Sequence, residues 1–166
     1  MREQLQQLVT ALRDELQQYG EMLALLERQQ EFVVKRASSD LLQSVSDINA
    51  QAAVIGVARD QRATRQTAVA RLLQMSDDTT LTDMVRLMPD DYSGLVRALV
   101  DEINKCLARV RRRAGQNHLL LSRSVELMQR LLNTLLCTTQ TIVYNGHGAL
   151  APALAAPGRP LCDFVG

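Results

Sequence analysis

The chain has 166 residues, which is enough for one domain with a core of moderate size. Its 19 Lys and Arg residues against 18 Asp and Glu residues give a net charge of +1, which disfavours a dedicated nucleic-acid or anionic-membrane surface. Aromatic residues are scarce and Leu, Ala, Gln, Arg and Glu dominate, so the composition indicates an all-α fold rather than a β-sandwich or barrel.

Cysteine usage and hydropathy predict a cytoplasmic protein. Cys106, Cys137 and Cys162 are widely spaced and form no Cys-x-x-Cys pair, so a disulfide scaffold is not expected. No window approaches the roughly 20 apolar residues that a membrane-spanning helix needs, and the first residues lack a signal-peptide pattern. Stable membrane insertion is therefore not expected.

The opening segment predicts a long helix over about residues 3–36. Apolar residues recur there at alternating steps of four and three, the pattern of coiled-coil-like packing against a partner helix. This first seam consists of Leu5, Val9, Leu12, Leu16, Tyr19, Leu23, Leu26, Gln30, Val33 and Ala37.

A short polar break at residues 37–40 separates this helix from a second one over about 40–75. Asp40 with Gln43 resembles a capping box, and Ser38 and Ser39 are alternative caps. Because the break is so short, the two helices should form an antiparallel hairpin. The second seam consists of Leu41, Val45, Ile48, Ala52, Ile55, Val69 and Leu73.

The rest of the chain predicts a connector, a third long helix and a tail. A short helix over about 80–88 ends at Pro89, and Asp90 or Asp91 can cap a helix over about 93–136, which Gly115 could bend. After residue 137 the sequence is rich in Ala, Pro and Gly and has no helical period, which predicts a disordered tail over 138–166. The folded domain is thus predicted to be a helical bundle over 1–137.

Catalytic chemistry has no evident residues. His118 and His147 have no Glu or Cys at helical ligand spacing, and no glycine-rich phosphate loop is present. His118 is most simply a surface residue and Cys106 a small core residue. We therefore expect no enzyme activity, no cofactor and no metal site.

The basic cluster Lys105, Arg109 and Arg111–Arg113 has two interpretations. Clustered arginines can neutralise nucleic-acid phosphates, or they can pair with acids on the first helix, such as Asp14, Glu15, Glu21 and Glu27. The near-neutral total charge and the lack of interleaved aromatics favour the second interpretation.

An excess of leucine marks residues 119–136. Leu119, Leu120 and Leu121 are consecutive and must point in three directions, so a two-helix hairpin cannot cover them all. Either a fourth element or a dimer mate covers the remainder, or the segment is a docking strip for a partner's amphipathic helix.

Several segments resemble the FlgN family of flagellar type III export chaperones, in their order and spacing, from the opening heptads to about Gly148. They are Leu12-Arg13-Asp14-Glu15-Leu16, Leu23-Ala24-Leu25-Leu26-Glu27-Arg28-Gln29, Gln116-Asn117-His118-Leu119-Leu120-Leu121-Ser122-Arg123-Ser124 and Val143-Tyr144-Asn145-Gly146. The Ala/Pro-rich ending from Ala149 departs from the family pattern.

The resemblance implies a cytoplasmic, helical chaperone that binds the C-terminal helical segments of hook-associated (hook-filament junction) proteins. Such a chaperone prevents their premature assembly and presents them to the flagellar export gate. The family's client-binding region maps here onto the last helix and the following segment. The expected client-binding residues are Asn117, Leu120, Leu121, Leu127, Met128, Leu131, Leu132, Leu135 and Tyr144.

Two other functions compete with this expectation. A structural coiled-coil adaptor or self-association module, such as a homodimer, would use the same leucines to bind its own kind. A helical nucleic-acid-binding protein would use the arginine cluster, and its affinity would fall steeply with salt.

The helical assignment predicts that residues 1–137 are helical except near 37–40 and 76–91. Circular dichroism of the full chain should therefore report well over half helix, against roughly a third in ordinary globular proteins. A spectrum with less than about half helix would contradict the architecture.

Overall fold

The computed structural model describes residues 1–138, with side chains as far as Leu135. Over these residues the fold is all-α, as predicted, and contains four helices and no strand. The helices are α1 (Arg2–Lys35), α2 (Ser38–Leu72), α3 (Leu81–Val85) and α4 (Asp90–Thr138). The tail predicted over 138–166 lies, beyond Thr138, outside the described residues.

The chain divides into two units, Met1–Leu121 and Ser122–Gly166. The first unit holds α1, α2, α3 and the first part of α4. Of the second unit, the described residues are the last part of α4.

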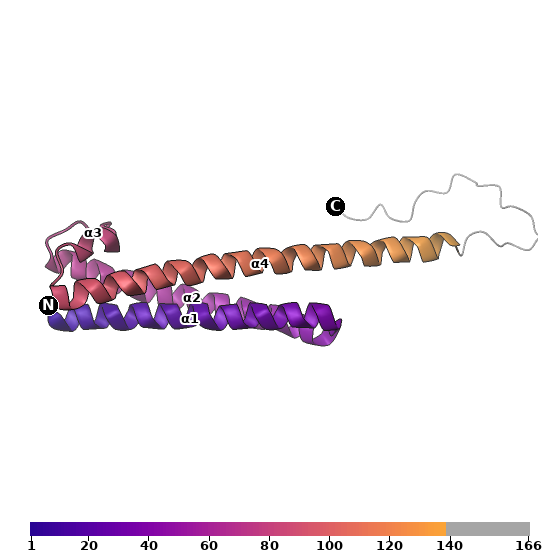
Figure 1. Cartoon of the computed structure of the whole chain (residues 1–166), viewed down its shortest axis with the longest axis horizontal. Helices are drawn as coiled ribbons and strands as arrows, with labels where there is room; N and C mark the ends of the chain where they lie inside the picture. Colours follow the sequence, from indigo (N-terminus) through magenta and orange to yellow (C-terminus); the bar gives the residue numbers. More distant parts are fainter. Residues whose placement is uncertain (139–166) are drawn as a thin grey trace, which may run out of the picture. The chain divides into compact units, whose positions relative to one another are not determined.

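The antiparallel hairpin of α1 and α2 is confirmed (Figure 1). Gln51 Nε2 donates to Gln18 Oε1 at 2.8 Å, and Arg65 Nη1 donates to Gln7 Oε1 at 2.7 Å. Arg65 follows Gln51 along α2, whereas its partner Gln7 precedes Gln18 along α1, so the two helices are antiparallel.

The prediction that a polar side chain caps α2 was wrong, because the chain reverses direction at Arg36, before the predicted capping residues. Arg36 adopts a left-handed conformation (φ 54°, ψ 33°), its N–H donates to Val33 O, and the next N–H donates to Phe32 O. This pair of bonds is a Schellman motif, which ends α1 and lets α2 begin directly at Ser38. Ala37 is the N-cap residue and supplies no side-chain bond, while Gln43 binds Asp47 instead.

The connector differs in length from the prediction. α2 ends at Leu72 and is followed by a second left-handed residue, Gln74 (φ 56°). α3 is shorter than predicted, and its N-cap residue is Thr80, whose hydroxyl accepts from the Asp83 N–H at 3.3 Å. α4 begins at Asp90, immediately after Pro89, with Asp90 and Asp91 in its first turn, and it continues through Gly115 without interruption.

α1 buries more of its surface than a two-helix seam would. Every residue of the predicted first seam is buried or half-buried, which confirms it. Four further positions, seven residues apart, are also buried: Leu8, Glu15, Met22 and Gln29. Since α1 contacts α2 on one side and α4 on another, it needs three buried positions per heptad rather than two.

α2 packs mainly through small residues. Ser44, Ala58 and Ala70 are buried, and the Cα atoms of α1 and α2 approach within 8 Å at many positions. Ile55 and Val69 of the predicted second seam are buried, but Val45 is 42% exposed and Ala52 is exposed. Small side chains let the backbones of α1 and α2 approach closely. They also offer little apolar surface to cover larger side chains on the neighbouring helices.

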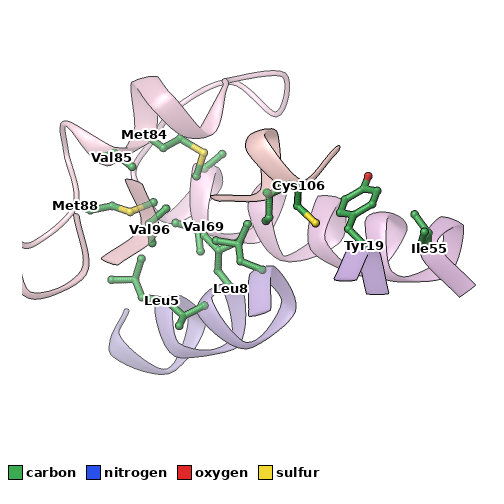
Figure 2. Close-up of a cluster of buried hydrophobic side chains, with 14 of the residues drawn as sticks. Leu5, Leu8, Tyr19, Ile55, Val69, Met84, Val85, Met88, Val96 and Cys106 are labelled. Carbon is green, nitrogen blue, oxygen red and sulfur yellow. The ribbon is translucent and has the colours of Figure 1, made fainter. Parts of the chain in front are cut away.

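One hydrophobic core joins all four helices in the first unit. Figure 2 shows Met84 and Met88, from α3 and just after it, directed towards Val69, Val96 and Leu5. Leu5 at the start of α1 shares this core with Val96 at the start of α4, and further along Asn117 of α4 bonds to Leu26 of α1, so α4 runs parallel to α1 in the first unit. Cys106 belongs to the same core and is 7% exposed, as predicted.

A buried ion pair fixes α1 against α2. Arg62 Nε donates to Glu15 Oε2 at 2.8 Å, and Glu15 is only 3% exposed. Arg62 Nη1 also binds Gln66, whose amide donates to Thr79 O, so the network reaches the connector before α3. Burial raises the pKa of the Tyr19 hydroxyl, and the adjacent Glu15 carboxylate raises it further, so Tyr19 stays neutral beside the pair.

A second polar layer fixes α4 against α1. Asn117 is 1% exposed, and its Nδ2 donates to Leu26 O at 2.7 Å and to Gln29 Oε1 at 3.0 Å. Its Oδ1 has no hydrogen-bond partner among the described residues. Arg113 reinforces the layer by donating to Gln30 Oε1 at 2.6 Å. A buried polar contact between helices specifies their register, because any slip leaves its groups unsatisfied.

Replacing Arg62 by Met should strand the Glu15 carboxylate in the core. We expect the free energy of unfolding to fall by about 2–4 kcal/mol, and the double variant Glu15→Met/Arg62→Met to regain most of that loss. Urea denaturation of the full chain at neutral pH measures both. Lys35→Met, which removes an exposed pair with Glu31, is the control and should cost less than about 0.5 kcal/mol. A single-variant cost no larger than this control would show that the pair does not hold the hairpin.

Replacing Asn117 by Ala should lower the free energy of unfolding by about 1–3 kcal/mol, because Leu26 O and Gln29 lose a buried donor. Asn117→Asp should cost more than Asn117→Ala, since it turns an acceptor towards two acceptors. Thermal and urea melts compare both with Gln116→Ala, a change at the exposed neighbouring residue. Equal stability of the Ala variants at 116 and 117 would rule out a structural role for this layer.

Candidate client-binding surface

The described part of the second unit is an amphipathic helical segment with its apolar side exposed. Its large apolar residues are all more than half exposed. We name them the leucine strip: Val125, Leu127, Met128, Leu131, Leu132 and Leu135. At about 100° per residue they fall within an arc of roughly 160° of the helix.

The opposite side of the same segment is polar. Glu126, Gln129, Arg130 and Asn133 occupy the arc between the ends of the strip and are exposed. An exposed apolar side of a helix is therefore a candidate interaction surface. An amphipathic partner helix would bury both apolar faces.

The structure divides the predicted client-binding residues that it describes into three groups, of which Asn117 alone is the third. Leu127, Met128, Leu131, Leu132 and Leu135 lie together on the leucine strip. Leu120 and Leu121 are half-buried at the end of the first unit. Tyr144 lies outside the described residues.

Asn117 lies apart from the other predicted residues. It is buried and bonded to α1, so its side chain is not accessible to a client in this conformation. In the sequence, a polar residue before a run of leucines resembles a surface position. Its hydrogen-bond partner, Leu26 O, lies 91 residues earlier in the chain. Its place is therefore in the polar layer between α1 and α4.

Sequence reasoning left Val125 out of the surface. Val125 is 55% exposed and precedes Met128 and Leu132 at steps of three and seven, which places it on the same face. That spacing was the signal available in the sequence.

The basic cluster is only partly paired. Arg113 lies 3.5 Å from Glu27, as the pairing interpretation predicted. Glu15 pairs instead with Arg62 of α2, and within residues 1–135 Arg109, Arg111 and Arg112 have no carboxylate at ion-pair distance. The cluster thus contributes contacts of Arg113 with Glu27 and Gln30 and an exposed pair of Lys105 with Glu102, and it leaves the other guanidinium groups facing solvent.

The described residues offer little for catalysis or metal binding. They contain no group of three or more His, Cys, Asp or Glu side chains that could hold a metal ion. His118 is exposed, and burial raises the pKa of the Cys106 thiol, which keeps it protonated and unreactive. None of the described helices is long and apolar enough to cross a membrane.

Comparison with known proteins identifies the family. The family model described as FlgN protein matches residues 1–152, which include every described helix. Comparisons with curated proteins and with solved structures gave no match. Since the family model covers most of the chain, the resemblance seen in the heptads and in the leucine-rich segment is confirmed, and the chain belongs to the FlgN family.

Proposed function

We propose that this protein is a cytoplasmic chaperone that binds the C-terminal helical segments of hook-associated (hook-filament junction) proteins. In this role it prevents their premature assembly and delivers them to the flagellar type III export apparatus. Membership of the FlgN family supports a flagellar export chaperone role in general. The observation that carries the finer proposal is the exposed leucine strip of α4.

The physical argument rests on matching apolar surfaces. A client segment that is unfolded alone exposes the apolar face of a nascent amphipathic helix and tends to self-associate. The leucine strip buries that face, with a gain of about 25 cal/mol per Å² of apolar surface removed from water. Ordering the client offsets part of this gain, so the complex is reversible. Reversibility suits a chaperone that must release its client at the export gate.

The surface that we propose is the leucine strip of the second unit, and Leu120 and Leu121, half-buried in the first unit, remain proposed contacts of their own. Tyr144 remains a proposed contact. Residues 1–137 are proposed to be the folded domain and 138–166 a tail. Asn117 is left out because its amide is bonded inside the first unit.

Leu127→Ala and Leu131→Ala test this surface one side chain at a time. Burial of each leucine by the client contributes about 1.5–3 kcal/mol, so each change should weaken binding roughly tenfold or more. Free-protein stability should barely move, because both side chains are more than half exposed. Calorimetry with a purified C-terminal segment of a hook-associated protein measures the affinity.

Two controls sharpen the result. Leu42→Ala is chemically identical but lies on α2, where Leu42 is 75% exposed, and it should leave the affinity unchanged. Arg112→Ala should stay within about threefold, because exposed charges contribute little. If the client does not bind, or if the strip variants only dissociate a homodimer of this chain, the protein is an adaptor rather than an export chaperone.

A further inference from the structure

A small pocket opens among α1, α2, α3 and α4 within the first unit. Its volume is about 220 Å³. Its apolar lining includes Leu12, Tyr19, Ile103 and Leu107, of which the first three are buried members of the core. This pocket shares no residue with the leucine strip, and neither the family match nor the proposed function assigns it a role.

Three arginines from two helices line the same pocket. Arg62 is already committed to Glu15 and Gln66. Arg59 of α2 and Arg111 of α4 are exposed, and within residues 1–135 neither has a carboxylate at ion-pair distance. Against the single Glu15 carboxylate, the pocket therefore carries two uncompensated guanidinium groups on walls contributed by different helices.

Arg59 acts on the pocket electrostatically. Its positive charge lowers the pKa of the Tyr19 hydroxyl, against the larger effect of burial. The pocket wall around Tyr19 is thus apolar, but the Arg59 guanidinium is close enough to act on it electrostatically. The buried Glu15–Arg62 pair holds this wall in place and leaves Arg59 and Arg111 for a ligand from outside.

We propose that this pocket binds an acidic segment of a partner protein, taking one carboxylate side chain together with the apolar side chain beside it. Guanidinium groups bind carboxylates through paired, charge-assisted hydrogen bonds. An inorganic anion would leave the apolar wall wet, whereas an apolar neighbour covers it.

The size of the pocket supports a side chain rather than a metabolite. Sites for drug-sized small molecules and cofactors usually measure about 300–1,000 Å³, so roughly 220 Å³ is too small for a nucleotide. It suits an anchor of one or two side chains. The chain then has two contacts of different chemistry, an apolar strip and a pocket for an acidic residue.

The test uses nuclear magnetic resonance titration of the full ¹⁵N-labelled chain. The probe is an acetylated, amidated peptide of sequence Gly-Glu-Leu-Glu-Leu-Gly, and the matched peptide has Gln in place of Glu. We expect the acidic peptide to shift the resonances of Arg59, Arg111 and Tyr19, and the neutral peptide to bind at least about tenfold more weakly.

Matched variants separate the pocket from general positive charge. Arg59→Gln and Arg111→Gln should each weaken the acidic peptide about tenfold, because each removes a charge-assisted contact. Arg112→Gln, an exposed arginine next to Arg111 that does not line the pocket, should change affinity less than about twofold. Leu127→Ala should leave peptide binding unchanged, so failure here and failure of the proposed client surface are distinguishable.

Four outcomes would overturn the proposal. They are equal binding of the neutral peptide, equal loss in all three arginine variants, displacement of the peptide by inorganic phosphate at the peptide's own affinity, and identical shifts with a single-stranded oligonucleotide. The second outcome would mean diffuse attraction, the third a plain anion site, and the fourth a nucleic-acid surface.

Discussion

The first unit depends on α1 being buried from two sides while carrying two polar residues in its buried stripe. Glu15 and Gln29 occupy the third buried position of the heptad, outside the apolar seam, and each has a partner on a different helix. Arg62 satisfies Glu15 from α2, and Asn117 satisfies Gln29 from α4. Apolar residues drive the association, but they tolerate sliding by a heptad. The two polar layers do not, because a slip would strand a charge or an amide in the core.

This arrangement also explains which parts of the fold the sequence could predict. The repeat of α1 is long and regular, so its helix and first seam were evident from spacing alone. Leu8 and Met22 were not predicted to be buried, because a seam derived for one partner helix omits the face of α1 that contacts a second helix. The start of α2 was assigned to polar caps, whereas chain reversal at Arg36 set it. Pairings such as Asn117 with Leu26 join residues far apart in sequence, and no local pattern encodes them.

The candidate surface was predictable because the last helix has more apolar side chains than the hairpin can cover. Too many leucines follow Asn117 for the hairpin to cover, and Leu127, Leu131 and Leu132 are more than half exposed. The pocket with Arg59 and Arg111 could not be predicted, because its walls come from four helices and its net charge depends on the ion pair between Arg62 and Glu15. The fold thus uses Arg62 and Arg113 for contacts between helices, while Arg59 and Arg111 have no carboxylate partner within residues 1–135.

The central claim is that a client binds the exposed apolar side of α4 in the second unit. Hydrogen–deuterium exchange of the full chain, with and without a hook-associated C-terminal segment, tests it directly. Our account predicts slowed exchange at backbone amides from 122 to 135 on addition of the client, since a helix covered by a partner opens less often. Protection confined to the first unit, with residues 122–135 unchanged, would contradict it.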